Sequence, residues 1–338
     1  MPYPYRVAAQ INIYPMDFQH VKHLLEHHIR VWGPMVERIV VTLDTHRSTS
    51  GRYRGSNFDT YLVELRKLLA EFGRRYPQLH TSEVDYSPEA RCEVAQAFFG
   101  LDDIPVKAWD GGPFYAYFYG LLHARAQYVV HFDGDMLFGG ASRTWVDEAI
   151  ELFSARPDTL LVSPFPGPPR DDGAIFGHGP DGSYEHIDVD GGPAYRFKSA
   201  STRIFMMDLQ RLRDRLGVLP LLAPDLISRC KSRLLGNPPD AREAEVILGE
   251  VLKANDLWRV DFLGREPGMW SLHPPYRSET FYARLPELIA AVESSQVPDA
   301  QRGDYDMNDS MIDWSAQRAN ARRYRRLARL LRDRLGLT

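Results

Sequence analysis

The chain has 338 residues, of which 44% are hydrophobic and 25% are charged, a composition that fits one large globular domain or two small ones. Its formal net charge of -4 gives no bulk attraction for nucleic acid, and its two cysteines exclude a fold built on disulfides. The amino terminus has no apolar segment typical of a signal peptide, and no stretch of roughly 18 apolar residues predicts a membrane span. We therefore expect a cytoplasmic protein.

The first half alternates apolar strand patterns with helical patterns, which predicts parallel strands joined by right-handed crossovers. An irregular stretch separates the third strand from the helix that begins at Pro113. In chain order we expect a strand over Tyr5–Tyr14, a helix over Phe18–Val36, a strand over Arg38–Leu43, a helix over Asn57–Tyr76, a strand over Leu79–Val84, a helix over Pro113–Ala126 and a strand over Tyr128–Phe132.

The second half is less regular. The segment from Pro166 to Pro193 is rich in Gly, Pro and Asp, and a loop of that length in a compact domain is usually functional. The remaining pattern predicts a helix over Trp145–Ser154, a strand over Leu160–Phe165, strand or hairpin structure over Ala194–Met207, a helix from Asp208, a helix over 240–255 and a strand over Leu257–Leu263. No repeat or sharp boundary is visible, so we expect one domain with two functional halves, 1–138 and 139–302, and a terminal segment over 303–338.

The terminal segment changes character from acidic to basic. Gly303–Asp313 is acidic, whereas Gln317–Arg334 carries eight arginines and an apolar stripe that includes Leu327 and Leu331. This pattern predicts a basic helix packed on the domain. A basic amphipathic helix can also rest on an anionic membrane, so peripheral membrane contact is the second interpretation.

An aspartate pair, Asp133 and Asp135, comes at the end of the apolar strand Tyr128–Phe132. A strand with apolar residues on both faces belongs in the middle of an α/β sheet, and such sheets bind ligands at the carboxyl ends of their strands. Two carboxylates at such an end suit a hard divalent cation that keeps coordination places open for phosphate oxygens. The pair can also serve simply to cap the turn that follows the strand.

The run Lys107–Pro113, the helix after it and the strand that ends in Asp133-Gly134-Asp135 together resemble the nucleotide-sugar half of GT-A fold glycosyltransferases. The first strand, ending at Tyr14, is similar to that of inverting members. The resemblance implies a Rossmann-like, mostly parallel central sheet flanked by helices, with residues 1–138 binding the nucleotide sugar and residues 139–302 binding the acceptor. It implies transfer of a sugar, with inversion, from a nucleotide diphosphate sugar, which we expect to be a UDP-sugar, to an unknown sugar, lipid-linked or small-molecule acceptor.

The same resemblance assigns roles at the donor site. It implies that Asp135 binds Mn²⁺ or Mg²⁺ directly and that Asp133 contacts the ribose or reaches the metal through water. It puts Tyr14 and Asp44 near the nucleoside, Asp85 near the base, and Asp110 near the ribose or base. Any one of the earlier aspartates can be a helix or turn cap instead.

Two further roles are expected in the second half. Some GT-A enzymes have a late histidine that joins the metal, and His273 in the run before Pro274-Pro275 is the candidate here. The resemblance puts the catalytic base, which accepts the proton of the acceptor hydroxyl, at Glu245 or Glu243. Acids in a first helical turn also favour the helix dipole, and Asp225 remains a further candidate.

Three other interpretations stay open at this stage. Phe132-Asp133-Gly134-Asp135 also resembles the nucleophile strand of haloacid-dehalogenase-type phosphatases, although Met136-Leu137 follows where that motif has Gly-Thr. Nucleotidyltransferases share a similar sheet, but no glycine occurs before Gly33 to form their phosphate-binding loop near the first strand. A noncatalytic nucleotide-sugar-binding protein is the third alternative.

Overall fold

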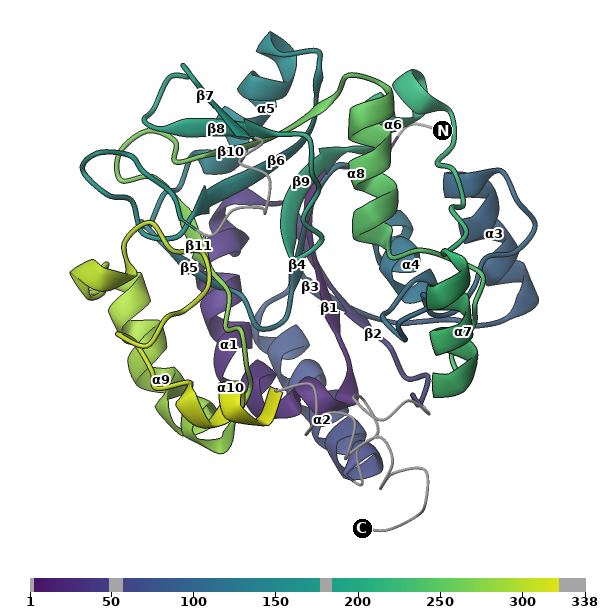
Figure 1. The fold of residues 1–338 in the computed structure, drawn as a ribbon. Coiled ribbons are helices and arrows are strands. Elements are labelled where there is room, and N and C mark those ends of the chain that lie inside the picture. Colours follow the sequence, from purple (N-terminus) through teal and green to yellow (C-terminus); the bar gives the residue numbers. More distant parts are fainter. Residues whose placement is uncertain (1–2, 49–56, 177–183, 322–338) are drawn as a thin grey trace.

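The computed structural model describes residues 3–48, 57–176 and 184–321. Its centre is a mixed sheet in which the strands follow the order β3-β2-β1-β4-β9-β6-β10-β8-β7, with β5 and β11 attached beside β6 (Figure 1). The strands are β1 (Tyr5–Ile13), β2 (Arg38–Leu43), β3 (Leu79–Glu83), β4 (Ala126–Asp133), β5 (Leu137–Gly139), β6 (Thr159–Pro166), β7 (Tyr184–Ile187), β8 (Ala194–Phe197), β9 (Ile204–Asp208), β10 (Trp258–Phe262) and β11 (Trp270–Leu272).

The four strands of the first half are parallel and in register, which confirms the predicted α/β arrangement. Asn12 lies opposite Asp133, and Ile13 lies opposite Leu43, so β1, β2 and β4 end at the same edge of the sheet. Beyond β4 the sheet is mixed, because β9 runs antiparallel to both β4 and β6. The strands of both halves therefore share one sheet.

Helices cover both faces of this sheet, as the apolar patterns predict. Buried side chains of α1, α2 and α5 pack on one face, and those of α3, α4, α6 and α8 pack on the other. A third apolar cluster joins α9 to β5 and β11. The helices are α1 (Phe18–Trp32), α2 (Phe58–Arg75), α3 (Pro88–Phe99), α4 (Tyr115–His123), α5 (Trp145–Ala155), α6 (Leu209–Leu216), α7 (Leu226–Leu235), α8 (Ala244–Ala254), α9 (Glu279–Glu293) and α10 (Ser315–Ala321).

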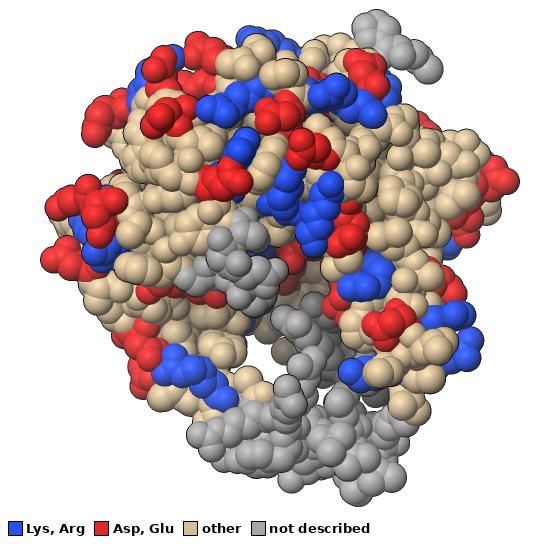
Figure 2. All heavy atoms as spheres, turned by 45° about the horizontal axis from the view of Figure 1, so that its top comes forward, with Lys and Arg blue, Asp and Glu red and all other residues tan. Residues whose placement is uncertain are grey.

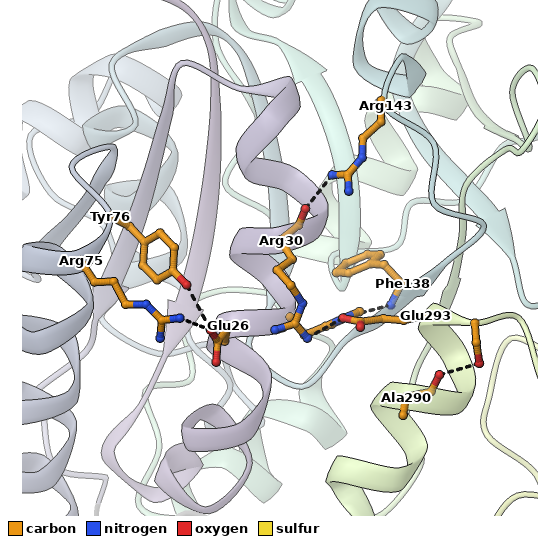
Figure 3. A network of polar contacts seen from close by, with 10 residues as sticks. Glu26, Arg30, Arg75, Tyr76, Phe138, Arg143, Ala290 and Glu293 are labelled. Carbon is orange, nitrogen blue, oxygen red and sulfur yellow. Dashed lines mark hydrogen bonds and ion pairs between the residues drawn. The ribbon is translucent and has the colours of Figure 1, made fainter.

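A polar network holds α1 against its neighbours (Figure 3). Glu26 of α1 pairs with Arg75 at 2.8 Å, at the end of α2. On the next turn, Glu293 of α9 pairs with both His27 and Arg30 at 2.7 Å. Nε2 of His27 accepts the Phe138 N–H at 3.0 Å, so the ring is neutral and its Nδ1–H donates to Glu293. Burial lowers the pKa of His27, which keeps the ring in this form.

Two local predictions are wrong. The stretch expected to be irregular holds α3, whose buried residues Val94, Ala95, Phe98 and Phe99 all fall in its second half, so the periodicity is weak at its start. The segment Pro166–Pro193, expected to be one loop, contains β7, which pairs antiparallel with β8. Ala194–Met207 holds the strands β8 and β9, as expected. The expected basic helix over 317–334 falls mostly outside the described residues.

The face in Figure 2 shows acidic and basic side chains interleaved, with neither sign covering a broad area. Attraction of a charged ligand at this face therefore depends on particular groups rather than on a field of one sign. Throughout the described ranges, every helix is too short or too polar to cross a bilayer.

Candidate functional site

The candidate site is a cluster of charged side chains at the carboxyl edge of the parallel strands. Asp133 is the last residue of β4, and its side chain is 44% exposed. Partial burial of the carboxyl raises its pKa, the guanidinium groups of Arg203 and Arg277 oppose that rise, and the carboxylates of Asp17 and Glu245 add to it. The two arginines and the two additional acids therefore lie close enough to Asp133 to act on its charge.

Asp135 has a different environment from Asp133. Its side chain is only 1% exposed, and it forms an ion pair with Arg277, which comes from the loop after β11 and is 35% exposed. Neither carboxylate oxygen has a hydrogen bond that satisfies it. A carboxylate buried in this way needs a cation beside it, because the cost of removing it from water is several kcal/mol, on the order of 3–5 when its partner is lost.

His273 follows β11 and is 5% exposed, as expected for a histidine held in a fixed loop. Its Nδ1 lies 2.7 Å from Asp306 Oδ1, and its Nε2 contacts the guanidinium of Arg203. Because Arg203 can only donate, Nε2 is the acceptor and Nδ1–H donates to Asp306. Both ring nitrogens are therefore directed at protein groups in this structure.

Arg203 is positioned by the backbone beside β4. The Asp133 N–H donates to the Arg203 carbonyl at 2.9 Å, and Nε2 of His131 lies 3.0 Å from the Thr202 carbonyl. Burial lowers the pKa of His131 to about 3, so the neutral ring donates this hydrogen bond. His131 thus holds Thr202, and the backbone of Asp133 holds Arg203, so both residues that precede β9 are fixed beside β4.

The same segment contacts Glu245, one of the two candidate bases at the start of α8. The Thr202 N–H donates to Oε2 of Glu245 at 3.2 Å, and the Glu245 side chain is otherwise exposed. Glu243 is the N-cap residue of α8, and its carboxylate lies 3.4 Å from the neighbouring Arg242. Of the two glutamates, only Glu245 is among the charges that shift the pKa of Asp133.

Asp44, at the end of β2, is 7% exposed and has three partners. Lys107 Nζ lies 3.0 Å from its Oδ2, and the hydroxyl of Tyr86 and the N–H of His46 donate to Oδ1. Tyr14 is close by, because Lys107 Nζ lies 5.8 Å from the centre of its ring. Lys107 and Tyr14 thus bring the ends of β1 and β2 together with the segment that precedes α4.

The two other predicted donor-site aspartates form turns. Oδ1 of Asp85 accepts the Ser87 N–H at 2.8 Å, and Oδ1 of Asp110 accepts the Gly112 N–H at 2.9 Å. Both side chains are exposed. Asp225 likewise accepts the Ser228 N–H at 2.8 Å and caps α7. These contacts are what the capping alternative predicts for all three residues.

The expected metal ligands are not assembled as a set of three. Within residues 3–48, 57–176 and 184–321, no group of three or more His, Cys, Asp or Glu side chains is arranged to hold a metal ion. Two of the expected ligands contact arginines instead, because Arg277 pairs with Asp135 and Arg203 contacts His273. The two aspartates still offer oxygen ligands of the kind that Mg²⁺ and Mn²⁺ prefer, and the buried Oδ1 of Asp135 has no hydrogen bond.

Sequence reasoning missed the basic members of the cluster. Arg203, Arg277 and Lys107 come from three distant segments, and single arginines and lysines carry no spacing signal of their own. Two of them do lie in segments already singled out, because Lys107 begins the run Lys107–Pro113 and Arg277 follows His273 by four residues.

Comparison with known proteins finds no matching family model and no matching curated protein. Among solved structures, S. aureus TarS in complex with UDP-GlcNAc is similar with a TM-score of 0.41 and 11% identity, over 85% of this chain and 66% of that chain. Galactosyltransferase LgtC, in complex with donor and acceptor sugar analogues, has a TM-score of 0.37 and 11% identity, over 88% of this chain and 99% of that chain. The mannosyltransferase PcManGT from Pyrobaculum calidifontis, in complex with GDP-Man and Mn²⁺, has a TM-score of 0.36 and 15% identity, over 100% of this chain and 90% of that chain.

The chain therefore spans about two thirds of the TarS chain that it matches.

Proposed function

We propose that the chain is a GT-A-like glycosyltransferase that moves a sugar from a nucleotide diphosphate sugar, expected to be a UDP-sugar, to an acceptor hydroxyl. The observation that carries the proposal is the cluster at the carboxyl edge of the sheet. There two aspartates at the end of β4 meet two arginines, with an exposed glutamate nearby at the start of α8. In open α/β sheets this edge is where ligands bind.

Asp133 and Asp135 would hold Mn²⁺ or Mg²⁺, because both offer carboxylate oxygens and Asp135 is buried with an oxygen that lacks a hydrogen bond. When bound, the cation would supply positive charge that stabilises the departing diphosphate. It would compete with the Arg277 guanidinium for the same carboxylate of Asp135.

Arg203 and Arg277 are suited to the diphosphate itself. A guanidinium group presents N–H donors in a planar fork that matches phosphate oxygens, and it stays charged at any physiological pH. In the structure Arg203 contacts His273, and Arg277 contacts Asp135. Diphosphate oxygens at this edge would therefore find positive charge already in place, in a setting that is partly shielded from water.

Glu245 is the proposed base. It accepts the proton of the acceptor hydroxyl as the oxygen bonds to the anomeric carbon, while the bond from that carbon to the diphosphate breaks. Attack from the side opposite the leaving group gives inversion. The exposed carboxylate can meet an acceptor from solvent, and the Thr202 N–H holds its Oε2. Glu243 is the weaker candidate, because its carboxylate is beside Arg242.

The direct test measures nucleoside diphosphate release and thermal shift with a panel of UDP- and GDP-sugars, with and without Mn²⁺. Asp135→Asn should lose both transfer and metal-dependent donor stabilisation. Glu245→Gln should keep donor stabilisation and lose transfer by roughly 10²–10⁴-fold, the usual contribution of a general base. Glu250→Gln, an exposed site on the same helix, is the matched control and should behave as the wild type.

Full transfer activity in Asp135→Asn would overturn the proposal. The phosphatase alternative gains no support from the site, because its acid and base would be Asp135, which is 1% exposed and ion-paired with Arg277. A noncatalytic binder would show donor-dependent stabilisation in every variant and no turnover in the wild type.

A further inference from the structure

α7 has its polar and apolar sides reversed relative to an ordinary surface helix. Ser228 and Ser232 face the protein and are 9% and 0% exposed. Leu226, Ile227 and Leu234 face outward and are 77%, 69% and 60% exposed. A helix that belongs wholly to a soluble domain normally puts its apolar stripe on the core.

The outward residues form one continuous stripe. Leu226, Cys230 and Leu234 recur every four residues, and Ile227 lies next to them, within an arc of about 100° on the helix. Cys230 is also exposed. Among the described residues, the three large apolar side chains of this stripe are the most exposed of their kind.

The helix is well formed, so its exposed stripe is not the result of a frayed segment. Asp225 caps its start by accepting the Ser228 N–H, and Gly236 ends it with a φ of 75°. The Ser232 hydroxyl donates to the Asn237 carbonyl at 2.7 Å. Its inner face is thus held by polar contacts, and the outward Leu226, Ile227 and Leu234 are in none of the buried apolar clusters that the described residues form.

Basic side chains flank the stripe on both sides. Arg229 and Arg233 lie along one border, and Lys231 lies along the other. In the described part of the chain no carboxylate forms an ion pair with any of the three. An apolar stripe bordered by free cations matches the boundary of an anionic lipid bilayer, where acyl chains accept the stripe and headgroups accept the charges.

We propose that α7 is an interfacial helix that binds the surface of an anionic lipid bilayer. In Figure 1, α7 lies at the periphery of the molecule, near the end toward which β1 and β2 point. Contacts hold the segments on either side of α7 against their neighbours, because Asn237 Nδ2 donates to the Trp109 carbonyl and the N–H of Arg242, two residues before α8, donates to the Leu222 carbonyl. A protein docked through α7 would therefore hold the start of α8, which carries Glu245, near the membrane.

The stripe on α7 belongs to a different part of the sequence from the basic segment over 317–334, which lies mostly outside the described residues. It is also independent of the proposed sugar transfer, because membrane binding is measured without substrate.

The test uses the full chain and sedimentation with vesicles of phosphatidylcholine alone or with about one third phosphatidylglycerol. We expect binding to the anionic vesicles only. The variant Leu226→Ser/Ile227→Ser/Leu234→Ser should partition onto these vesicles at least tenfold more weakly than the wild type. The variant Arg229→Gln/Lys231→Gln/Arg233→Gln should partition more than tenfold more weakly, since each basic residue near such a surface contributes roughly fivefold. Val63→Ser, an equally polar change at an exposed site on α2, is the control and should bind as the wild type.

Cys230 allows a readout that is specific to α7. In a Cys92→Ser background, an environment-sensitive fluorophore on Cys230 should shift to the blue with anionic vesicles and be quenched by brominated lipid. If the protein sediments with the vesicles while the fluorophore on Cys230 shows neither the blue shift nor the quenching, another segment binds the membrane. That result would overturn the proposal. Loss of a dimer in the serine variant, measured by analytical ultracentrifugation without lipid, would instead assign the stripe to a second copy of the chain and would equally overturn it.

Discussion

Replacing Arg277 with methionine tests the electrostatics at the centre of the candidate site. The change removes the cation beside Asp135 and keeps much of the side chain's apolar length. Asp135 is 1% exposed, so the lost ion pair leaves a buried carboxylate without a counter-charge. Breaking a buried pair in this way costs about 3–5 kcal/mol. Because Arg277 is 35% exposed, we take the lower end, about 3 kcal/mol.

That cost can be converted into a shift of the melting temperature. An unfolding entropy of about 2.1 cal/mol/K per residue means that 1 kcal/mol lowers the melting temperature of a chain of this size by roughly 1.4 °C. Arg277→Met should therefore melt roughly 4 °C below the wild type. Asp135→Asn should cost less, about 1 kcal/mol, because the remaining guanidinium can turn toward water.

The double variant Asp135→Asn/Arg277→Met separates charge from packing. With neither charge present, it should recover most of the stability lost in Arg277→Met, and the two changes should be clearly non-additive. Calorimetry at pH 7.5 in the presence of a chelator measures all four proteins. Equal melting of Arg277→Met and the wild type, or additive losses in the double variant, would refute the reasoning.

The same variants test the proposed cation site without any activity measurement. If Mn²⁺ binds the carboxylate that Arg277 now occupies, Mn²⁺ at a hundredfold excess over the variant's Kd should stabilise Arg277→Met by about 2.7 kcal/mol. It should stabilise the wild type by less, because there the ion must displace the guanidinium. The double variant should gain nothing. A Mn²⁺ response that is equal in all three proteins would place the ion elsewhere.

Three further predictions concern groups outside the acid pair. The contacts from His27 and then Arg30 hold the pKa of Glu293 at about 2, so this carboxylate stabilises the fold above pH 4.5 and the gain is lost as pH falls toward 2. Screening at its partly exposed position reduces this gain in the free energy of unfolding to about 1–2 kcal/mol. Urea unfolding of Glu293→Gln should show a deficit of that size at pH 7 and almost none at pH 2.5. A deficit that does not change with pH would contradict the prediction. Lys107→Met should lower the free energy of unfolding by about 2–3 kcal/mol, because it leaves the buried Asp44 without its cation. A loss below 0.5 kcal/mol in the same assay would show that the neighbouring hydrogen-bond donors are enough to stabilise this carboxylate. Gly120→Ala should cost about 1–3 kcal/mol, because a Cβ on α4 would meet a buried polar side chain of β1; an unchanged unfolding midpoint would mean that this side chain can move aside.

Apart from α3, the architecture of the first half could be predicted from the sequence alone. Strand and helix patterns alternate there with clear periods, and parallel strands joined by helices have few alternatives, so the common edge for Tyr14, Asp44 and Asp133 follows from local signals. The fully apolar run before Asp133 correctly indicated a central strand, and the burial of β4 reflects that pattern.

Only the tertiary structure decided which charges meet at that edge. Arg203 and Arg277 reach the aspartates from a segment before β9 and a loop after β11, and neither distance along the chain nor residue type predicts such a contact. It also decided that Asp85 and Asp110 form turns, because a carboxylate two residues before a backbone N–H can cap a turn or bind a ligand from the same sequence. Hydrophobic periodicity tells which face of an element is buried, but the pairing of single charges depends on how distant elements pack. The helix α7, with its apolar face outward, shows that periodicity also leaves open what covers an apolar face.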